Sequence, residues 1–365
     1  MPLGSSPAFF HANRLPYAEH YNFSLQRQFG NATIMSISYV GTQAHRLLAT
    51  VEANPSNPAL CFSLLAAGCG PNGEDAGPFT SASGATVYSV RSPYNNVVPS
   101  LSGTPVEAFA SDGYMATMAN SNYNALELTL RRTLGRAEFL AGYTYSKSLD
   151  NTSGNGLGQG DNINPINPKI TKSLSAFNVE HNFVVSYSYR VPFDKLPGPK
   201  RLTNDWLLNG ITRFATGFPV YILETDDRSM LGTSGTGQGN DIDEPNRALG
   251  SLDFQNPRSG QPYFNTALFT PEPKPQIVPT VVEPQLGNSS RRFFGGPGWN
   301  NFDLSLTKDV KLTEAKSLQF RAEFFNAWNH AQFGSPTGNI NNSTFGYVTN
   351  ANPPRIGQVS MKFFF

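Results

Sequence analysis

Apolar and polar residues alternate along nine separate stretches of the chain. In residues 20–29, for example, Tyr21, Phe23 and Leu25 alternate with Ser24 and Gln26. A period of two residues is typical of a β-strand that presents one apolar and one polar face. The same pattern predicts strands at residues 20–29, 33–40, 124–132, 136–146, 182–193, 204–222, 301–310, 318–328 and 355–365.

The connections between these strands alternate strictly between short and long. Short turns follow the first, third, fifth and seventh strands, whereas long connections cover roughly residues 50–120, 150–180, 223–298 and 331–354. Transmembrane barrels have short periplasmic turns and long extracellular loops, whereas a soluble sandwich has no reason to sort its loops in this way. We therefore expect an all-β fold: an antiparallel transmembrane β-barrel portion of about nine strands, with short periplasmic turns and long extracellular loops.

The two faces of the strands fit a barrel that crosses a bilayer. The polar face carries charged residues such as Glu127, Glu138 and Glu323, which suit a wet lumen, and the apolar face suits lipid. The alternative is a soluble β protein whose aromatic residues lie in its core. Aromatic residues near strand ends are candidates for the girdles at the two membrane interfaces. These candidates are Tyr143, Tyr145, Trp206 and Trp328.

Composition narrows the possible classes of protein further. The formal net charge is +1, and only 15% of the 365 residues are charged, which argues against a nucleic-acid partner. No apolar run approaches the roughly 20 residues of a membrane helix, and the N-terminal stretch lacks the pattern of a secretory signal peptide. Cys61 and Cys69 are candidates for a small disulfide loop formed in an oxidising compartment. The alternative is two free buried thiols.

No catalytic, cofactor or metal motif emerges, so we predict a protein that is not an enzyme and has no cofactor. The histidines show no zinc-protease spacing, and the glycine-rich stretches 154–162 and 232–246 lack the ending of a phosphate loop. His45 and His330 are more simply interfacial polar residues than metal ligands. Three acidic residues within 232–246 could hold Ca²⁺, although a solvated loop explains them better. These three are Asp241, Asp243 and Glu244.

The end of the chain resembles a signal found in bacterial outer-membrane proteins. Its alternating apolar residues are Val359, Met361, Phe363 and the final Phe365. In that group of proteins the signal is read by the barrel-assembly machinery. The resemblance therefore implies that these side chains face lipid and also mark the chain for assembly.

A second resemblance covers nearly the whole chain. Residues 299–337 are similar to the last strands of TonB-dependent transporters, particularly of the Oar-like branch, and residues 125–150 and 210–222 are similar to earlier strands. Such transporters have about 22 strands around a plugged lumen. Because nine strands are expected here, with no visible plug, TonB box or signal peptide, we expect residues 1–365 to be the C-terminal part of such a barrel, as a fragment or a truncated gene product.

The resemblance implies that the whole protein binds a scarce solute and imports it with energy from TonB. The long loops 51–119 and 223–298 are the expected contacts for an unknown extracellular ligand. The implied partners are the lipid bilayer, the barrel-assembly machinery and, only through the missing plug, the TonB complex. Two alternatives remain: a structural or adhesive outer-membrane protein without transport, and a soluble secreted β protein that binds carbohydrate.

Overall fold

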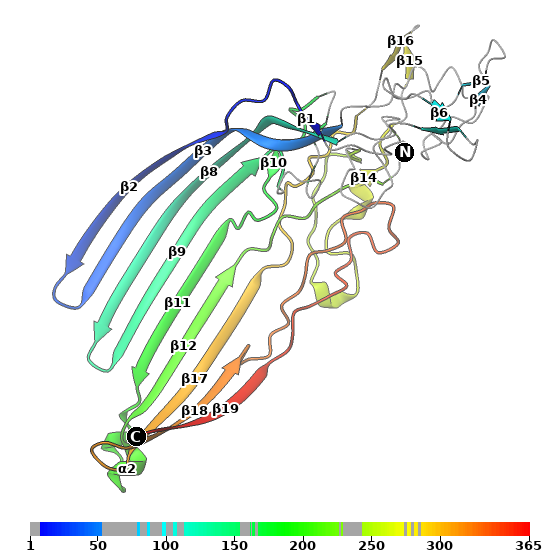
Figure 1. The fold of residues 1–365 in the computed structure, drawn as a ribbon. Helices are drawn as coiled ribbons and strands as arrows, with labels where there is room; N and C mark the ends of the chain where they lie inside the picture. The colour runs from blue at the N-terminus through cyan, green and yellow to red at the C-terminus, as the bar shows by residue number, and fades with distance from the viewer. Residues whose placement is uncertain are drawn as a thin grey trace.

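The computed structural model describes residues 8–52, 113–153, 161, 163–164, 167–225, 228, 243–273 and 286–365, together with six short strand segments within 79–107 and 276–283. Nine long strands form one sheet in which every neighbouring pair is antiparallel (Figure 1). They are β2 (Tyr17–Phe29), β3 (Thr33–Glu52), β8 (Gly113–Leu134), β9 (Ala137–Asp150), β11 (His181–Arg190), β12 (Trp206–Ala215), β17 (Trp299–Lys311), β18 (Ser317–Phe325) and β19 (Ile356–Phe364).

The remaining elements are short. Two of them extend the large sheet: β1 pairs with β8 and β10 pairs with β9. The short strands are β1 (Ala8–Phe9), β4 (Phe79–Thr80), β5 (Thr86–Val87), β6 (Val97–Pro99), β7 (Pro105–Glu107), β10 (Ser173–Leu174), β13 (Asn246–Arg247), β14 (Phe269–Thr270), β15 (Gln276–Val278) and β16 (Val281–Glu283). The helical turns are η2 (Pro192–Lys195), α2 (Lys200–Thr203), η3 (Pro257–Ser259) and η4 (Thr266–Leu268).

The long strands follow one another in space as they do in sequence. The order across the sheet is β2, β3, β8, β9, β11, β12, β17, β18 and β19, which is a simple up-and-down meander. This arrangement confirms the predicted antiparallel fold class and the alternation of connections. Tight turns at Gly30 and Gly135, both with positive φ, join two of the pairs, because glycine adopts this conformation without steric cost.

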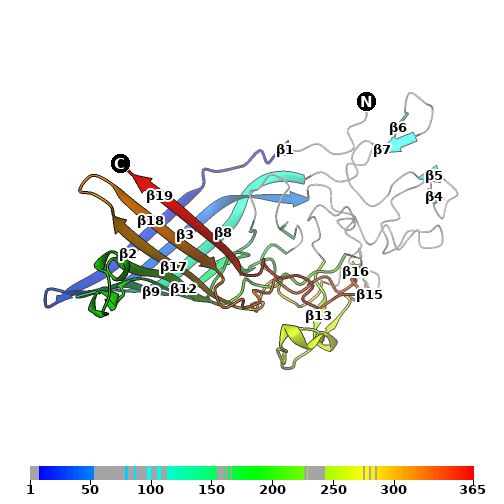
Figure 2. The ribbon, with the colours of Figure 1, turned by 90° about the horizontal axis from the view of Figure 1, so that it is seen from below.

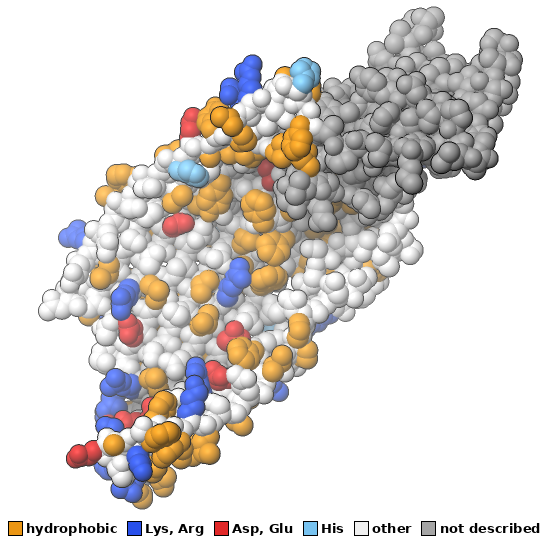
Figure 3. Space-filling model, viewed as in Figure 1, with side chains coloured by type: hydrophobic (Ala, Val, Ile, Leu, Met, Phe, Trp, Pro, Cys, Tyr) orange, Lys and Arg blue, Asp and Glu red, His pale blue; other side chains and the backbone are white. Residues whose placement is uncertain are grey.

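The sheet is strongly curved and has a polar concave face. Figure 2 shows the terminal strands bending to the same side of the central strands β9 and β12. Figure 3 views the hollow of this curve, where charged and uncharged polar side chains surround scattered apolar ones. The register explains this polar face, since Ser38 lies beside Glu127 and Glu127 lies beside Thr144.

The opposite face is apolar, exposed and continuous across the strands. Ile37 on β3 lies between Leu25 on β2 and Leu128 on β8, and the same parity continues to Met361 and Phe363 on β19. Leu128 is partly buried, but the other side chains named here remain exposed although they are large and apolar; Met361, for example, is 65% exposed. A face of this kind is stable only against another apolar medium.

The sixth predicted strand was wrong at its C-terminal end. Instead of running to residue 222, β12 ends at Ala215. The chain then turns away because Gly217 packs so closely that an added Cβ would lie 2.3 Å from the carbonyl oxygen of Gly296, and Pro219 lacks a backbone donor. Val220, which was expected on the strand's apolar face, is buried in a loop core instead.

The long connections build a packed layer at one end of the sheet. Its core contains five buried side chains from the connections after β12, with Ile340 and Phe345 from the connection after β18 packed against them. The five are Val220, Ile222, Phe264, Phe269 and Phe294. Among the described residues, no helix is both long and apolar enough to cross a membrane.

The two faces can be tested with a matched pair of charge insertions on β3. An Ile37→Arg change places a charge on the apolar face, and we expect it to lower the free energy of unfolding in lipid vesicles by about 2–4 kcal/mol. A Ser38→Arg change places the same charge on the polar face beside Glu127 and should cost less than about 1 kcal/mol. Denaturant titration measures both. Equal costs would contradict the assignment of the faces.

Candidate functional site

A polar hollow lies on the concave face where the connection after β9 folds over the sheet. The Ser148 backbone N–H donates to Asn178 Oδ1 at 2.7 Å, and the Ser146 hydroxyl donates to the Val179 carbonyl at 2.8 Å. These bonds hold residues 175–179 against the polar face of β9. The result is a cavity of about 310 Å³ whose walls are mostly polar.

The cavity brings together groups of opposite charge from distant strands. Glu127 on β8 and Arg213 on β12 both line it. Arg213 Nε donates to Asn182 Oδ1 at 2.9 Å, and its guanidinium lies 5.0 Å from the centre of the Trp299 ring. Phe177 adds an exposed ring to the wall. This combination can bind polar solutes by hydrogen bonds and by stacking.

Buried ion pairs tie the connections after β9 and β12 together. Asp161 accepts two hydrogen bonds from Arg292, both of 2.7 Å, and Arg291 Nη1 lies 2.7 Å from the same carboxylate. Arg291 also donates to the carbonyl oxygens of Asn151 and Thr171. All three charged side chains are nearly fully buried. Bidentate pairing of this kind fixes orientation as well as charge.

The arginines control the titration of the buried carboxylate. Burial alone would raise the pKa of Asp161, but the hydrogen bonds from Arg292 and the charges of Arg291 and Arg292 outweigh it and hold the pKa below its usual value. Asp161 therefore stays ionised at neutral pH. Its charge is needed because it compensates the two buried arginines.

A second buried cluster in the same layer is rich in carboxyl groups, and Arg228 Nε lies 3.6 Å from Glu224 Oε1 at its edge. Glu224 Oε2 accepts a hydrogen bond from the Glu272 backbone N–H at 2.7 Å, and Glu272 Oε1 accepts one from Gly287 at 2.6 Å. Burial, reinforced by the charge of Asp243, raises the pKa of Glu272 to about 10. Burial also raises the pKa of Glu244 to about 8, although Arg291 opposes the shift. Both carboxyl groups are largely protonated at neutral pH.

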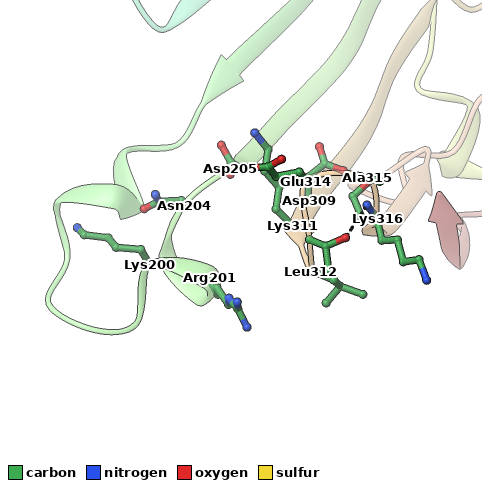
Figure 4. A pocket seen from close by; sticks show the side chains of 12 residues that line it. Lys200, Arg201, Asn204, Asp205, Asp309, Lys311, Leu312, Glu314, Ala315 and Lys316 are labelled. Atoms are coloured by element: carbon green, nitrogen blue, oxygen red, sulfur yellow. Dashed lines mark hydrogen bonds between the residues drawn. The ribbon is translucent and has the colours of Figure 1, made fainter. Parts of the chain in front are cut away.

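A larger hollow lies at the opposite, short-turn end of the sheet. It has a volume of about 680 Å³ and lies between the turn that contains α2 and the turn after β17 (Figure 4). Lys200 and Arg201 line one side and Lys316 the other, with Asp309 and Glu314 between them. The mixed charges and open shape of this hollow suit contact with water more than the selective binding of one solute.

Most of the aromatic residues predicted as girdles lie near the two ends of the apolar face. Tyr145 is on the long-loop half of β9, and Tyr143 is near the middle of that strand, where its Oη lies 2.8 Å from His181 Nδ1. Trp328 follows β18 at the same end and is 66% exposed. Trp206 begins β12 at the other end, where its indole N–H donates to the Leu202 carbonyl at 2.8 Å.

The predicted assembly signal occupies one face of the last strand. Val359, Met361 and Phe363 lie beside Ala322, Phe320 and Leu318 on β18. Val359, Met361 and Phe363 are exposed. Phe365 is exposed as well, and its ring lies 5.8 Å from that of Phe363.

Several other candidate site residues from the sequence either fall outside the described residues or do not lie together in one site. The structure does not describe Cys61, Cys69 and Asp241, and among the residues it does describe there is no group of three potential metal ligands. His45 is on β3, with its Nδ1 3.1 Å from Asn120 Oδ1, whereas His330 lies after β18. The expected ligand-contact loop 51–119 is described only in part.

Sequence reasoning missed Asp161, Arg291, Arg292 and Glu272. The pair Arg291–Arg292 lies about 130 residues from Asp161, and no spacing rule connects positions so far apart. The only local signal was two adjacent arginines followed by two phenylalanines in a long loop.

Comparison with known proteins identifies the family. Residues 2–358 match the family described as "Outer membrane beta barrel domain". The chain belongs to this family. Its location is therefore the cell outer membrane, and the exposed apolar face of this barrel domain contacts the lipid bilayer.

Similarity to individual proteins is weaker. No curated protein matches the chain. Among solved structures it is similar to the outer membrane transporter YddB from Escherichia coli, with 10% identity, a TM-score of 0.45 and coverage of 98% of this chain and 34% of that one. It is also similar to the FrpB iron transporter from Neisseria meningitidis, with 11% identity, a TM-score of 0.39 and coverage of 98% and 33%. The chain thus spans about a third of the length of these structures.

The buried ion pairs give a testable acid sensitivity. An Asp161→Asn change leaves two buried arginines without their carboxylate, and we expect it to destabilise the loop layer by about 3–5 kcal/mol. Because the pKa of Asp161 is lowered in the folded state, its stabilisation is present above the unfolded value of about 3.9 and is lost as pH falls below it. Hydrogen exchange of residues 163–178 measures both effects. The exposed Asp253→Asn serves as the control and should change neither.

The acidic cluster gives the opposite pH dependence. Because the pKa values of Glu244 and Glu272 are raised, their stabilising contribution is present below the unfolded value of about 4.3 and decreases as pH rises towards the folded values. We expect the protection of backbone amides in residues 243–273, taken relative to their base-catalysed intrinsic exchange, to decrease between pH 5 and pH 8. A Glu272→Gln change should slow exchange at pH 8 and flatten this dependence. If the variant kept the full pH dependence of the unmodified chain, the assignment to Glu272 would be wrong.

Proposed function

We propose that this chain is the C-terminal barrel portion of a TonB-dependent outer-membrane receptor that binds a scarce solute and imports it. The proposal rests on the resemblance of residues 299–337 and of the C-terminal stretch to the last strands of such transporters. One structural observation also supports the proposal: the nine long strands form a curved sheet that has two free edges within the described residues.

The free edges are β2 and β19. Each has one long-strand neighbour in the sheet, so one side of its backbone is left without a ladder. In lipid, unpaired backbone groups each cost several kcal/mol, and a spanning sheet must therefore close on itself. Further strands of a larger barrel would pair with both edges and close the wall. This requirement favours a piece of a large barrel over a complete small one.

The loop layer is the proposed place of solute contact. Buried ion pairs and an aromatic core hold the long connections in one arrangement over one end of the sheet. A rigid scaffold that presents polar loops is the common way in which binding residues are positioned. The concave cavity with Glu127 and Arg213 lies directly beneath this layer and would continue the path of a polar solute.

The remaining roles follow from this placement. The long loops would be extracellular and the short turns periplasmic. Tyr143, Tyr145 and Trp328 would lie at one membrane interface and Trp206 at the other. The alternating side chains of β19, from Val359 onwards, would be read by the barrel-assembly machinery, and TonB would act through a plug on the longer protein.

Two other functions are alternatives to the import of a solute. A structural or adhesive outer-membrane protein would use the same loop layer without a plug or energy coupling. A soluble secreted carbohydrate-binding protein does not agree with membership of an outer-membrane family.

The size of the native polypeptide tests the proposal. An antibody against residues 357–365 should detect, in fractionated outer membranes, a band far larger than the 39.7 kDa of this chain, because a plug and further strands are expected on the same polypeptide. An outer-membrane band at 39.7 kDa would contradict the plugged transporter and favour the structural or adhesive alternative. A control blot for a known periplasmic protein excludes contamination of the fractions.

A further inference from the structure

A groove lies on the apolar face of the sheet, near the end that carries the long loops. It consists of two adjoining cavities of about 700 and 310 Å³, which share Leu174 and Phe293 in their walls. We refer to the pair as the outer groove. It adjoins the polar cavity of the concave face at Asn178, which lines both, but its apolar walls come from the other face of the sheet.

The register places the outer groove on the face that contacts lipid. Leu174 on β10 pairs with Leu149 on β9, which has the same parity as Tyr145. Phe183 on β11 lies between Tyr143 and Phe214 across the sheet. These side chains share the apolar parity. Leu149, Leu174, Phe183 and Phe214 among them form the sheet side of the groove.

The outer wall comes from the connection between β12 and β17. Figure 2 shows the segment around β13 projecting on the convex side of the sheet. Phe254, which is half exposed, and Phe293 line the larger cavity from this segment. Both rings pack on Phe294, with centroid distances of 5.7 and 4.9 Å, so the wall is anchored in the core of the loop layer.

The smaller cavity adds positive charge above this apolar part. The exposed Lys147 and Lys172 line it, together with Glu180 and the buried Arg292. Lys147 has the same parity as Tyr145 and lies two residues closer to the long-loop end of β9. Arg247 reinforces the positive potential, since its guanidinium lies 4.3 Å from the centre of the Phe293 ring.

We propose that the outer groove binds one membrane lipid that has an anionic phosphate headgroup, with its acyl chain against Phe183, Phe254 and Phe293 and its phosphate against Lys147 and Lys172. The order of the two halves matches a lipid in the bilayer: the apolar half lies towards the middle of the sheet and the basic half towards its rim. Lysine side chains near a membrane surface attract anionic headgroups. Aromatic rings with a polar rim are also typical of membrane interfaces. The proposal does not depend on transport.

Native mass spectrometry of the full chain in mixed micelles tests this site. Phosphatidylglycerol and phosphatidylcholine with identical acyl chains are titrated separately, and the first bound lipid is quantified. We expect phosphatidylglycerol to bind about 10-fold more tightly, which corresponds to about 1.4 kcal/mol. The double variant Lys147→Glu/Lys172→Glu should bring the two affinities within about twofold of each other. Lys169→Glu, an exposed lysine in the same connection that does not line the groove, should keep the preference.

A second pair of variants tests the apolar half. Phe254→Ser should weaken the binding of both lipids about fivefold, whereas Leu249→Ser, at a fully exposed position of the same segment, should leave binding unchanged. Glycerol 3-phosphate, which has the phosphate but no acyl chain, should not displace bound phosphatidylglycerol. Equal affinity for both lipids in the unmodified chain, a preference that survives the double lysine change, or displacement by glycerol 3-phosphate would each overturn the proposal.

Discussion

The constraint on which the structure depends is the need to pair every backbone polar group of a segment that crosses lipid. A meander satisfies it locally, since each long strand pairs with its neighbours in sequence from β2 to β19. The same constraint fixes the side-chain pattern. Once the ladder is set, successive residues must point to opposite faces, so Ile37 faces lipid and Ser38 faces the hollow. Among the nine long strands that the structure describes, only the edge strands β2 and β19 leave one side of the backbone unpaired.

Outside the sheet, interactions other than strand pairing stabilise the chain. Where β12 ends at Ala215, the chain is no longer held by a sheet and must satisfy its polar groups within the loop layer. It does so partly by irregular backbone bonds, such as that from Ile222 to the Arg291 carbonyl. It also does so by buried charge, with Asp161 between Arg291 and Arg292. Removing one partner of such a cluster costs more than the cluster contributes as a whole, because the remaining charges stay buried.

This difference between the sheet and the loop layer explains which features of the structure could be predicted from the sequence. Strand positions, turn lengths and the exposed face of β19 were predictable, because alternation is a local property that a single chain displays. The end of β12 was missed because the apolar alternation continues through Phe218 and Val220, although Gly217 and Pro219 already turn the backbone. Asp161 and Arg292 could not be paired from sequence, since their contact depends on how two long connections fold over the same strand end.

One short stretch connects the two faces of the loop layer. Arg291 and Arg292 bind Asp161 inside the layer. Arg292 and the next residue, Phe293, also line the outer groove, and Phe293 carries the guanidinium of Arg247 over its ring. Phe294 then enters the aromatic core. Because these residues are consecutive, loosening the ion pairs must also displace the groove wall. The buried charge therefore supports both the arrangement of the loops above the hollow and the shape of the surface that meets the membrane.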